Sequence, residues 1–382
     1  MRTTVFAPIQ TLVRLGSSAI FLLCFTVYAA MANGHCVAPR DFPNPELLAT
    51  MRKGVNLPGW DRPDVSGRPS LDQLRALRAE GFTHIRLPLD NGPFDGDQAT
   101  AYVDSVYEQV ILLLSLGYTV SLDLHPDKTV GQLFEQSPAV GSAYLAKMWV
   151  PLARMARMLD PEKVALELLN EPQIGQDNWL AAAEQLIELL RTIVPDHTII
   201  VGPPGPQRHE TLSGMRPFAD RNIVYAVHYY DPFLFTHQGA TWGATDDPLQ
   251  RLADLPFPAS IEDEAIAKIK SKLSAAGESA SLKALNEALE EPWTEAGIAQ
   301  AFNTMADWAS ANERPVIVNE FGVLSFVAPR TARLQWLETV SRLAQARCIG
   351  RVHWDFSDGF GLIDHQTGLP DPDTITALNA PG

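Results

Sequence analysis

The chain has 382 residues, of which 46% are hydrophobic and 20% are charged, and this composition indicates a globular rather than a disordered protein. Its length allows one large domain or two ordinary ones, and neither an internal repeat nor a low-complexity tract is visible. The formal net charge is −15, and a strongly acidic surface disfavours nucleic acids, anionic lipid headgroups and polyanionic substrates as partners.

The first 32 residues have the pattern of a secretory signal peptide. Arg2 and Arg14 precede an apolar run that reaches Ala30, and a small-x-small cleavage site ends at Ala32. The run is short for a membrane span, although an uncleaved N-terminal anchor is the alternative. We therefore expect residues 1–32 to be removed on export, to the periplasm or beyond, and the mature chain not to span a membrane.

Residues 33–382 contain eight apolar runs that predict buried β-strands, and helical segments separate most of them. A helix is predicted to open at the capping box that starts at Ser70 and to stop at Gly81, and another is predicted to stop at Gly117. Further helices are predicted at 178–193, 261–273, 295–310 and 331–346. The predicted strands are 54–57, 84–89, 119–125, 164–170, 198–202, 223–230, 316–320 and 351–356.

Strands that alternate with helices predict an α/β protein with a parallel sheet. Eight such units favour a closed (β/α)8 TIM barrel that forms a single catalytic domain over residues 33–382. A doubly wound open sheet is the alternative, but no glycine-rich phosphate loop follows the first strand. About ninety residues separate the sixth and seventh strands, so we expect an enlarged loop region there that forms one wall of a substrate cleft.

Cys36 and Cys348 remain after cleavage of the signal peptide, and export would place them in an oxidising environment. Cys348 comes just before the eighth strand, and Cys36 lies in the segment that leads into the first strand, which is its neighbour in a closed barrel. The sequence therefore predicts a disulfide between them, with two free buried thiols as the alternative.

Two apolar runs stop at acidic residues. V-A-L-E-L-L-N-E-P contains Glu171, and P-V-I-V-N-E-F-G contains Glu320. The carboxyl ends of barrel strands form one rim, where enzymes of this architecture hold their catalytic groups. Two carboxylates on this rim are the minimum needed to cleave a glycosidic bond, although either one alone is equally explained as an ordinary strand-end acid.

Six further polar or aromatic residues stand at the ends of these strands, and together they predict a site rather than separate packing or salt-bridge roles. Zn²⁺ ligation by His125, Asp127 and His228 is a competing explanation for the histidines, but no H-x-H or H-E-x-x-H spacing supports it. We therefore expect neither a metal nor a cofactor. The six residues are Arg86, His125, Asn170, His228, Tyr230 and Trp354.

These motifs resemble those of glycoside hydrolase family 5, the cellulase-type family of clan A. The resemblance runs from about residue 52 to 364, in the order G-V-N-L-P-G-W, H-I-R-L-P, L-D-L-H, L-L-N-E-P, H-Y-Y-D-P-F-L-F-T-H-Q-G, V-N-E-F-G and H-W-D-F. It implies a retaining O-glycoside hydrolase in which Glu171 is the acid/base and Glu320 the nucleophile. The other six residues match the family's remaining active-site positions, and the departures lie in the loops, chiefly after strand six.

Elementary chemistry supports these roles. A nucleophile must be ionised, which a nearby Arg86 guanidinium and a hydrogen bond from Tyr230 would favour. The acid must start protonated, which requires partial burial and a negatively charged partner roughly 5 Å away. Asn170 can hydrogen-bond the sugar 2-hydroxyl, and Trp354 offers an apolar face to a pyranose ring.

Three further tryptophans, Trp60, Trp179 and Trp242, follow strands one, four and six. They could extend the sugar platform along a polymer, and ordinary loop packing is an equally good explanation.

We predict an exported retaining β-glycosidase that hydrolyses a β-linked glucan, most simply as an endoglucanase. An exo-acting β-1,3-glucosidase, a β-mannanase and a transglycosylase use the same site and remain alternatives. A barrel that binds glycans without catalysis is the alternative from a different class, and the intact glutamate pair argues against it. The sequence leaves linkage, endo or exo action and oligomeric state open.

Overall fold

The computed structural model describes residue 36, residues 38–64 and residues 68–382, so the predicted signal peptide lies outside the described residues. Residues 38–382 form one compact unit. Among the described residues, no helix has both the length and the apolar character needed to cross a membrane.

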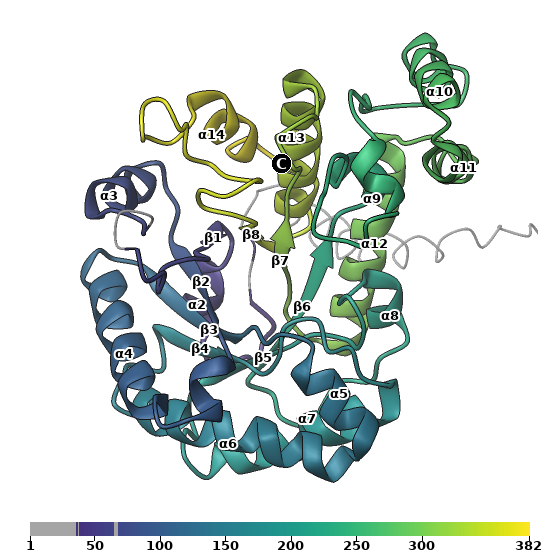
Figure 1. The fold of residues 1–382 in the computed structure, drawn as a ribbon. Helices are drawn as coiled ribbons and strands as arrows, with labels where there is room; N and C mark the ends of the chain where they lie inside the picture. Colours follow the sequence, from purple (N-terminus) through teal and green to yellow (C-terminus); the bar gives the residue numbers. More distant parts are fainter. Residues whose placement is uncertain (1–35, 37, 65–67) are drawn as a thin grey trace, which may run out of the picture. The chain divides into compact units, whose positions relative to one another are not determined.

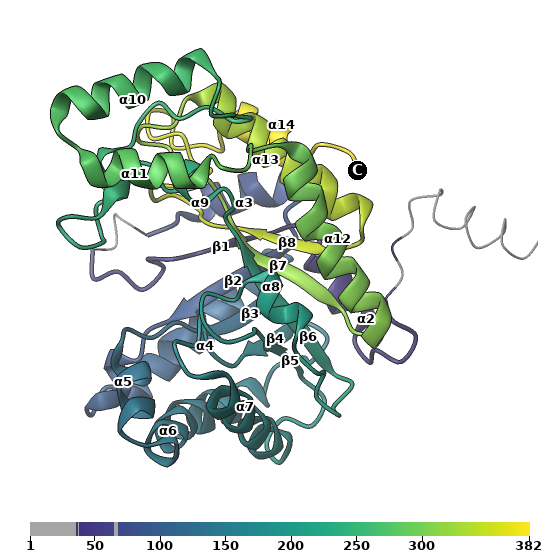
Figure 2. The same cartoon turned by 90° about the vertical axis from the view of Figure 1, so that its right-hand side faces the viewer.

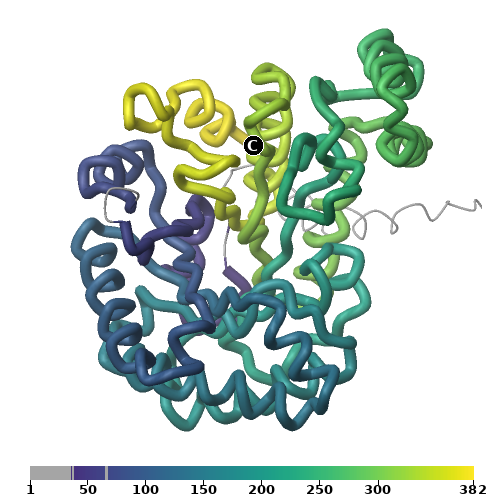
Figure 3. The backbone as a smooth tube through the Cα atoms, viewed as in Figure 1, coloured from purple at the N-terminus to yellow at the C-terminus, as the bar shows by residue number. Residues whose placement is uncertain are grey.

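Eight parallel strands close into a barrel in sequence order, which confirms the predicted fold (Figure 1). Closure is made where β1 pairs with β8, with Gly54 opposite Val352. Figure 3 shows the chain passing round the barrel from the purple N-terminal part to the yellow C-terminal part. The strands are β1 (Gly54–Asn56), β2 (His84–Leu89), β3 (Thr119–Leu124), β4 (Val164–Glu167), β5 (Thr198–Val201), β6 (Ile223–Tyr229), β7 (Val316–Phe321) and β8 (Gly350–His353).

Helices surround the barrel, as Figures 1 and 2 show. The principal ones are α3 (Leu71–Ala79), α4 (Ala99–Ser115), α6 (Pro138–Ala156), α7 (Gln176–Arg191), α12 (Glu295–Asn312) and α13 (Arg330–Ala346). Shorter helices lie in the connections, namely α2 (Pro45–Thr50), η2 (Gly92–Asp95), α5 (Thr129–Gln136), α8 (His209–Ser213), α9 (Phe233–Thr236), η3 (Pro248–Arg251), α10 (Glu264–Ala276), α11 (Ser279–Ala288) and α14 (Pro372–Leu378).

Local sequence signals set several of these boundaries. The side chain of Ser70 accepts a hydrogen bond from the Gln73 main-chain N–H, and the Gln73 side chain accepts one from the Ser70 main-chain N–H. The predicted capping box therefore starts α3. Gly81 and Gly117 follow α3 and α4 with φ of 86° and 84°, a conformation that glycine adopts without a steric cost. Both predicted helix ends are confirmed.

Six of the eight strands end earlier than predicted, whereas β2 ends at Leu89 as predicted and β7 continues one residue further, to Phe321. β4 stops at Glu167 rather than at 170, and β8 stops at His353 rather than at 356. Glu171 has a φ of 40°, which a β-strand cannot contain, so the chain turns before this residue. Asn170, Glu171 and Trp354 therefore lie just beyond the strands, in the loops that form the rim.

Two sets of contacts stabilise the barrel, one at its floor and one on its outside near the rim. At the opposite end, the apolar side chains of Phe42, Leu47 and Met51 pack with interior residues of β4, β5, β6 and β7 and close the floor. On the outside, buried helix tryptophans donate their indole N–H to main-chain carbonyls near the rim: Trp149 to Leu168, and Trp336 to Asp231. These bonds tie the helices to the loops that carry the site.

The long interval between β6 and β7 holds α9, η3, α10, α11 and α12, and α11 is a helix that the sequence analysis did not predict. Figures 1 and 2 show α10 and α11 side by side. Lys268 and Glu264 pair on the exposed face of α10, in agreement with the amphipathic pattern of this segment. The enlarged loop region after strand six is thus present.

Cys36 and Cys348 are both disulfide-bonded, as the sequence analysis expected.

Gly322 follows β7 immediately, and a Cβ atom added there would lie 2.2 Å from the carbonyl oxygen of Trp354. Because that oxygen belongs to the backbone, Gly322→Ala must displace the ends of β7 and β8. We expect a loss of roughly 1–3 kcal/mol in the free energy of unfolding, measured by denaturant titration.

The matched control for this variant is Gly297→Ala in α12, where the nearest atom to an added Cβ lies at 3.8 Å. This change should leave stability unchanged or raise it slightly. Equal stability of the two variants would contradict the close approach at Gly322.

Candidate active site

The barrel rim brings all eight predicted site residues together. Arg86 lies within β2, His228 within β6 and Glu320 within β7, while His125, Tyr230 and Trp354 each follow directly after a strand. His228 stands at a register irregularity of β6, next to Val227. Side chains alternate along a strand, so His228 and Tyr230 both point to the site while Tyr229 packs outward against Phe302 and Trp336.

Glu320 is held by a charged donor and a neutral donor. Arg86 Nη1 donates to Glu320 Oε1 at 2.6 Å, and the Tyr230 hydroxyl donates to Oε2 at 3.0 Å. Burial and the adjacent Glu320 raise the pKa of Tyr230, so its hydroxyl stays protonated and remains a donor. These two donors fix the positions of both carboxylate oxygens of Glu320.

Arg86 is completely buried and connects three acidic residues. Its Nε and Nη2 donate to the two oxygens of Glu167 at 2.7 and 2.9 Å in a bidentate pair. Nη2 also lies 2.9 Å from Asp123 Oδ2, and Nη1 lies 2.6 Å from Glu320 Oε1. The rigid guanidinium plane therefore fixes the position of Glu320 relative to β4 and β3.

A second chain of hydrogen bonds orients Asn170. The amide oxygen of Asn170 accepts from Arg86 Nη2 at 2.8 Å, and its Nδ2 lies 3.2 Å from His125 Nε2. His125 Nδ1 in turn lies 2.9 Å from Asp123 Oδ2, which indicates a neutral imidazole with its proton on Nδ1. His125 stacks on Trp354 with ring centroids 5.5 Å apart. One N–H of Asn170 is thereby left to face a bound molecule.

Glu171 has a different environment from Glu320. Its main-chain N–H donates to Gln207 Oε1 at 2.7 Å, and this bond holds the backbone in its positive-φ conformation. Its carboxylate Oε1 lies 2.9 Å from His228 Nδ1. Burial raises the pKa of Glu171 and outweighs the opposing effect of His125 and Arg86. Glu171 is therefore the carboxyl of the pair that is suited to hold a proton.

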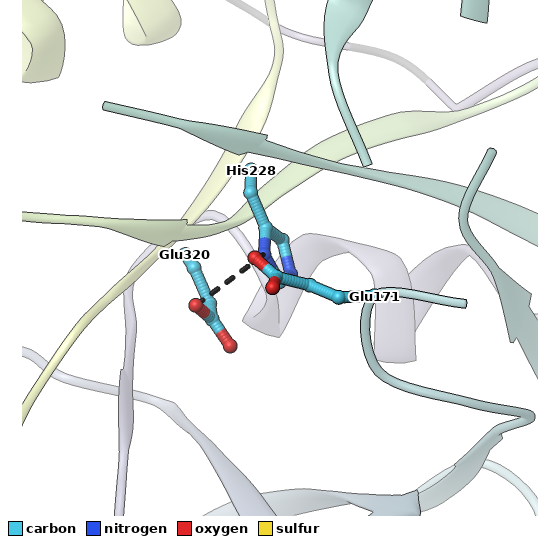
Figure 4. Close-up of side chains that lie close together, drawn as sticks. All are labelled: Glu171, His228 and Glu320. Atoms are coloured by element: carbon cyan, nitrogen blue, oxygen red, sulfur yellow. Dashed lines mark hydrogen bonds and ion pairs between the residues drawn. The ribbon is translucent and has the colours of Figure 1, made fainter. Parts of the chain in front are cut away.

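Figure 4 shows Glu171 and Glu320 reaching toward each other, with His228 beside them. One oxygen of each carboxylate and one nitrogen of His228 all lie within 4.8 Å of one another. His228 Nδ1 is 3.3 Å from Glu320 Oε2 as well as 2.9 Å from Glu171. Burial lowers the pKa of His228 to about 4, so the ring is neutral near pH 7 and offers one shared proton to the two glutamates.

Several residues of this site were not identified from the sequence. The sequence did contain a signal for Glu167 and Asp123, because each is an acidic residue within an otherwise apolar strand run. Asn56 accepts a bond from Arg86 at 2.9 Å, and Asn319 donates to Glu167 at 2.8 Å. Gln207 lies in a proline-rich loop after β5, and no pattern in that loop pointed to Glu171.

Two of the three proposed platform tryptophans do not face the cleft, which corrects the sequence analysis. Trp179 belongs to α7 rather than to a loop, is 0% exposed and donates its indole N–H to Gly202. Trp60 is 5% exposed and donates to the carbonyl of Pro88. Both pack as core residues because helix and loop cover their faces. Trp242 is 62% exposed and remains available to a ligand.

Two groups of side chains within the described residues have the donor atoms for a cation. In Glu171, His228 and Glu320, the donor atoms already bond to one another, and the Arg86 charge 2.6 Å from Glu320 opposes a metal ion. The second group is His209, Glu210 and Asp231. Arg208 pairs with both Glu210 and Asp231 at 2.8 Å, so its charge opposes a metal ion there as well. Zinc ligation by His125, Asp127 and His228, the alternative considered above, uses residues that do not form one of these groups.

A closed (β/α)8 barrel whose rim presents two facing glutamates, one raised in pKa and one held by an arginine and a tyrosine, defines the class of barrel glycosidases. The family model described as Cellulase (glycosyl hydrolase family 5) matches residues 49–359 of this chain. The chain belongs to glycosyl hydrolase family 5.

Curated relatives agree with this assignment. Endoglucanase 3 of Fibrobacter succinogenes is 27% identical over 84% of this chain, which spans 51% of that protein. Endoglucanase C of Acetivibrio thermocellus is 24% identical over 81% of this chain and 92% of its own length. The chain thus spans about half the length of the Fibrobacter relative but nearly all of the Acetivibrio one.

Solved structures share the fold. Endoglucanase Cel5A from Thermotoga maritima superposes with a TM-score of 0.69 at 21% identity, covering 88% of this chain and 99% of that one. The cellulose synthase subunit Z of Clostridioides difficile gives a TM-score of 0.68 at 23% identity over 86% of this chain and 99% of its own.

Glu167 contacts no part of the open cleft, yet it sets the orientation of Arg86. We expect Glu167→Gln to lower kcat/KM for any substrate by about 10²-fold, because a misplaced guanidinium shifts Glu320. Activity should be measured together with thermal unfolding. Glu162→Gln, in the exposed loop before β4, is the control and should not change activity. Wild-type activity in Glu167→Gln would exclude the positioning role.

Proposed function

We propose that this protein is a retaining endo-acting β-glucanase that cleaves β-1,4-linked glucan by double displacement. Glu320 is the nucleophile and Glu171 the general acid/base. The single observation that carries the proposal is the approach of the two carboxylates to within 4.8 Å, oxygen to oxygen. Retaining enzymes hold their carboxyl groups roughly 5–5.5 Å apart, whereas inverting enzymes need about 6.5–9.5 Å to admit a water molecule.

The surroundings of each glutamate support the assignment of roles. Glu320 receives hydrogen bonds from Arg86 and Tyr230 and is the carboxylate prepared to attack the anomeric carbon. Glu171 has a raised pKa because it is partly buried, which suits a group that must protonate the leaving oxygen. In the second step, Glu171 takes a proton from the water that releases the sugar. The free N–H of Asn170 binds the 2-hydroxyl of the reacting sugar.

The relatives support β-1,4-glucan as the substrate. Several of them are named endoglucanases, and Thermotoga maritima Cel5A has been solved in complex with cellobiose and with mannotriose. A β-mannan is therefore the second substrate to examine. Product analysis on cello-oligosaccharides, mixed-linkage glucan, laminarin and mannan separates the endoglucanase from the mannanase and from an exo-acting β-1,3-glucosidase, and sugar-transfer products would reveal a transglycosylase.

An aromatic wall extends from the catalytic rim toward the sixth loop. The ring of Tyr230 contacts His237 and Phe360, with centroids 4.9 and 6.0 Å apart, and Trp242 lies 6.3 Å from Phe360. Because Trp242 is largely exposed, its face is available for sugar stacking at a distance from the reacting bond. This arrangement suits a polymer that extends beyond the site.

Export through residues 1–32 completes the proposal, since a polymeric glucan cannot be taken up whole. The arginines, the apolar run and the small-residue cleavage site of that segment support secretion or release into the periplasm.

Substitution of the two glutamates tests the roles. Glu320→Ala should lose about 10⁴-fold or more in turnover of every substrate, because no covalent glycosyl-enzyme forms. Glu171→Ala should still release dinitrophenolate from an activated β-glycoside, because that leaving group needs little protonation. Azide should then give a β-glycosyl azide with Glu171→Ala and an α-glycosyl azide with Glu320→Ala, as nuclear magnetic resonance can determine.

If Glu171→Ala gave the α-glycosyl azide and Glu320→Ala the β-glycosyl azide, Glu171 would be the nucleophile and Glu320 the acid/base. Inversion of the anomeric centre by the wild type would refute double displacement. If the wild type bound glucans but did not cleave them, the protein would instead be a barrel that binds glycans without catalysis.

The raised pKa of Glu171 sets the alkaline side of the pH profile. A carboxyl with a raised pKa keeps its proton to higher pH, so kcat/KM for a natural glucan should fall only when the pH passes above that value. With Glu171→Gln and a dinitrophenyl glycoside, kcat/KM should lack this alkaline fall, because no acid is required. If kcat/KM of Glu171→Gln still fell at alkaline pH as in the wild type, a group other than Glu171 would be responsible for that fall.

A further inference from the structure

A buried arginine outside the catalytic cleft connects three segments of the chain. Arg333 lies near the start of α13 and is 4% exposed. Its Nε donates to the carbonyl oxygen of Val323 at 3.2 Å, and its Nη2 donates to those of Phe360 and Gly361 at 3.1 and 3.0 Å. Its Nη1 donates to the hydroxyl of Thr374 in α14 at 2.9 Å. One side chain therefore joins the loop after β7, the loop after β8 and α14, which packs beside α13 (Figures 1 and 2).

The oxygens that Arg333 binds are all uncharged, since they belong to three main-chain carbonyls and one hydroxyl. Burial lowers its pKa to about 10, so the side chain remains a cation near pH 7. Asp371 attracts the guanidinium, but its Oδ2 accepts the hydroxyl of Thr374 at 2.6 Å instead. Such a cation contributes little net stability, whereas its rigid fork of donors fixes carbonyl groups accurately. The arrangement is therefore explained best by the positions that it fixes.

An apolar cluster lies between these carbonyl groups and the catalytic rim. Phe360 belongs to this cluster, and Leu324, which follows Val323, is a second member. Tyr230 and Trp354 of the rim pack against it. The positions of the two loops therefore reach the substrate-binding side chains through packing. The members of this rim cluster are Ala240, Leu324 and Phe360.

Trp242 is the aromatic residue of the wall that depends most on this cluster. Its ring contacts those of His237 and Phe360, with centroids 6.0 and 6.3 Å apart, while 62% of the residue is exposed. Tyr230 is in addition fixed by its hydrogen bond to Glu320. A shift of Phe360 therefore moves the stacking face of Trp242 more than it moves the reacting groups.

We propose that Arg333 is a positioning residue for substrate binding, because it holds the loops after β7 and β8 where Phe360 supports Trp242. This inference rests on the proposed function and adds to it a residue outside the cleft. Arg333 contacts none of the reacting groups. Loss of its guanidinium should therefore weaken the binding of a glucan chain that reaches Trp242, and it should leave the reaction of a short substrate nearly unchanged.

Kinetics of Arg333→Lys provide the first test. Lysine keeps the positive charge but has one nitrogen in place of three, so it cannot hold all three carbonyl groups. For cellohexaose, KM should rise about tenfold while kcat changes by less than about twofold. For 2,4-dinitrophenyl β-cellobioside, both constants should stay within about twofold of the wild type. An unchanged KM for cellohexaose, or an equal loss on both substrates, would overturn the inference.

Arg330→Lys is the matched control. Arg330 lies on the same helix and binds Asp371 and Asp373 at the start of α14 rather than loop carbonyl groups. This variant should leave both KM values unchanged. Thermal unfolding of Arg333→Lys and Arg330→Lys is measured alongside. A lowered Tm of Arg333→Lys with a wild-type ratio of the two kcat/KM values would show a purely structural role and overturn the inference. If the wild type cleaved neither substrate, the proposed function would be overturned, and the inference with it.

Phe360→Leu tests the same route without a change at a buried charge. Leucine stays apolar within the rim cluster but lacks the ring that contacts Trp242. Its KM for cellohexaose should rise about as much as that of Arg333→Lys. The double variant should show no further rise, because both changes act through one contact. Fully additive effects, or a wild-type KM in Phe360→Leu, would also overturn the inference.

Discussion

The buried guanidinium of Arg86 is the interaction on which the rest of the site depends. A completely buried cation is tolerated only when its charge and all its donors are satisfied, and here Glu167, Asp123 and Glu320 supply that compensation. The partners come from β2, β3, β4 and β7, so they meet only when the barrel has closed. Removal of Arg86 would leave these three buried acids without their shared cation, which links the stability of the barrel interior to the position of Glu320.

This arrangement also separates the chemistry of two identical side chains. Glu320 is tied to the central cation, whereas Glu171 stands outside the arginine pair, next to a neutral histidine and in a half-buried position, with 36% of its side chain exposed. Burial without a directly bonded cation raises the pKa of a carboxyl, so one glutamate is suited to carry charge and the other a proton. His228 lies between them, and its Nδ1 contacts both carboxylates.

The loops add selectivity to this fixed centre. The strand ends hold the reacting groups, while the sixth loop supplies the exposed Trp242 and the third loop supplies α5. Because the barrel is stabilised by its floor, its strand pairing and its buried tryptophans, these connections can vary without loss of the fold. The long connection after β6 is therefore the part of this chain where we expect substrate preference to reside.

The sequence by itself determined the architecture and the placement of Glu171 and Glu320 at one rim, because apolar strand runs, helix caps and strand-end polar residues are local signals that a parallel barrel brings together. Only the tertiary structure decided where the strands stop, since the turn at Glu171 depends on Gln207 from the next loop. It likewise decided that Trp60 and Trp179 are core residues while Trp242 is exposed, because identical side chains differ only in what packs over them. Asn56, Asn319 and Gln207 were not recognised for the same reason: their partners are distant in sequence, and no periodicity encodes a contact between them.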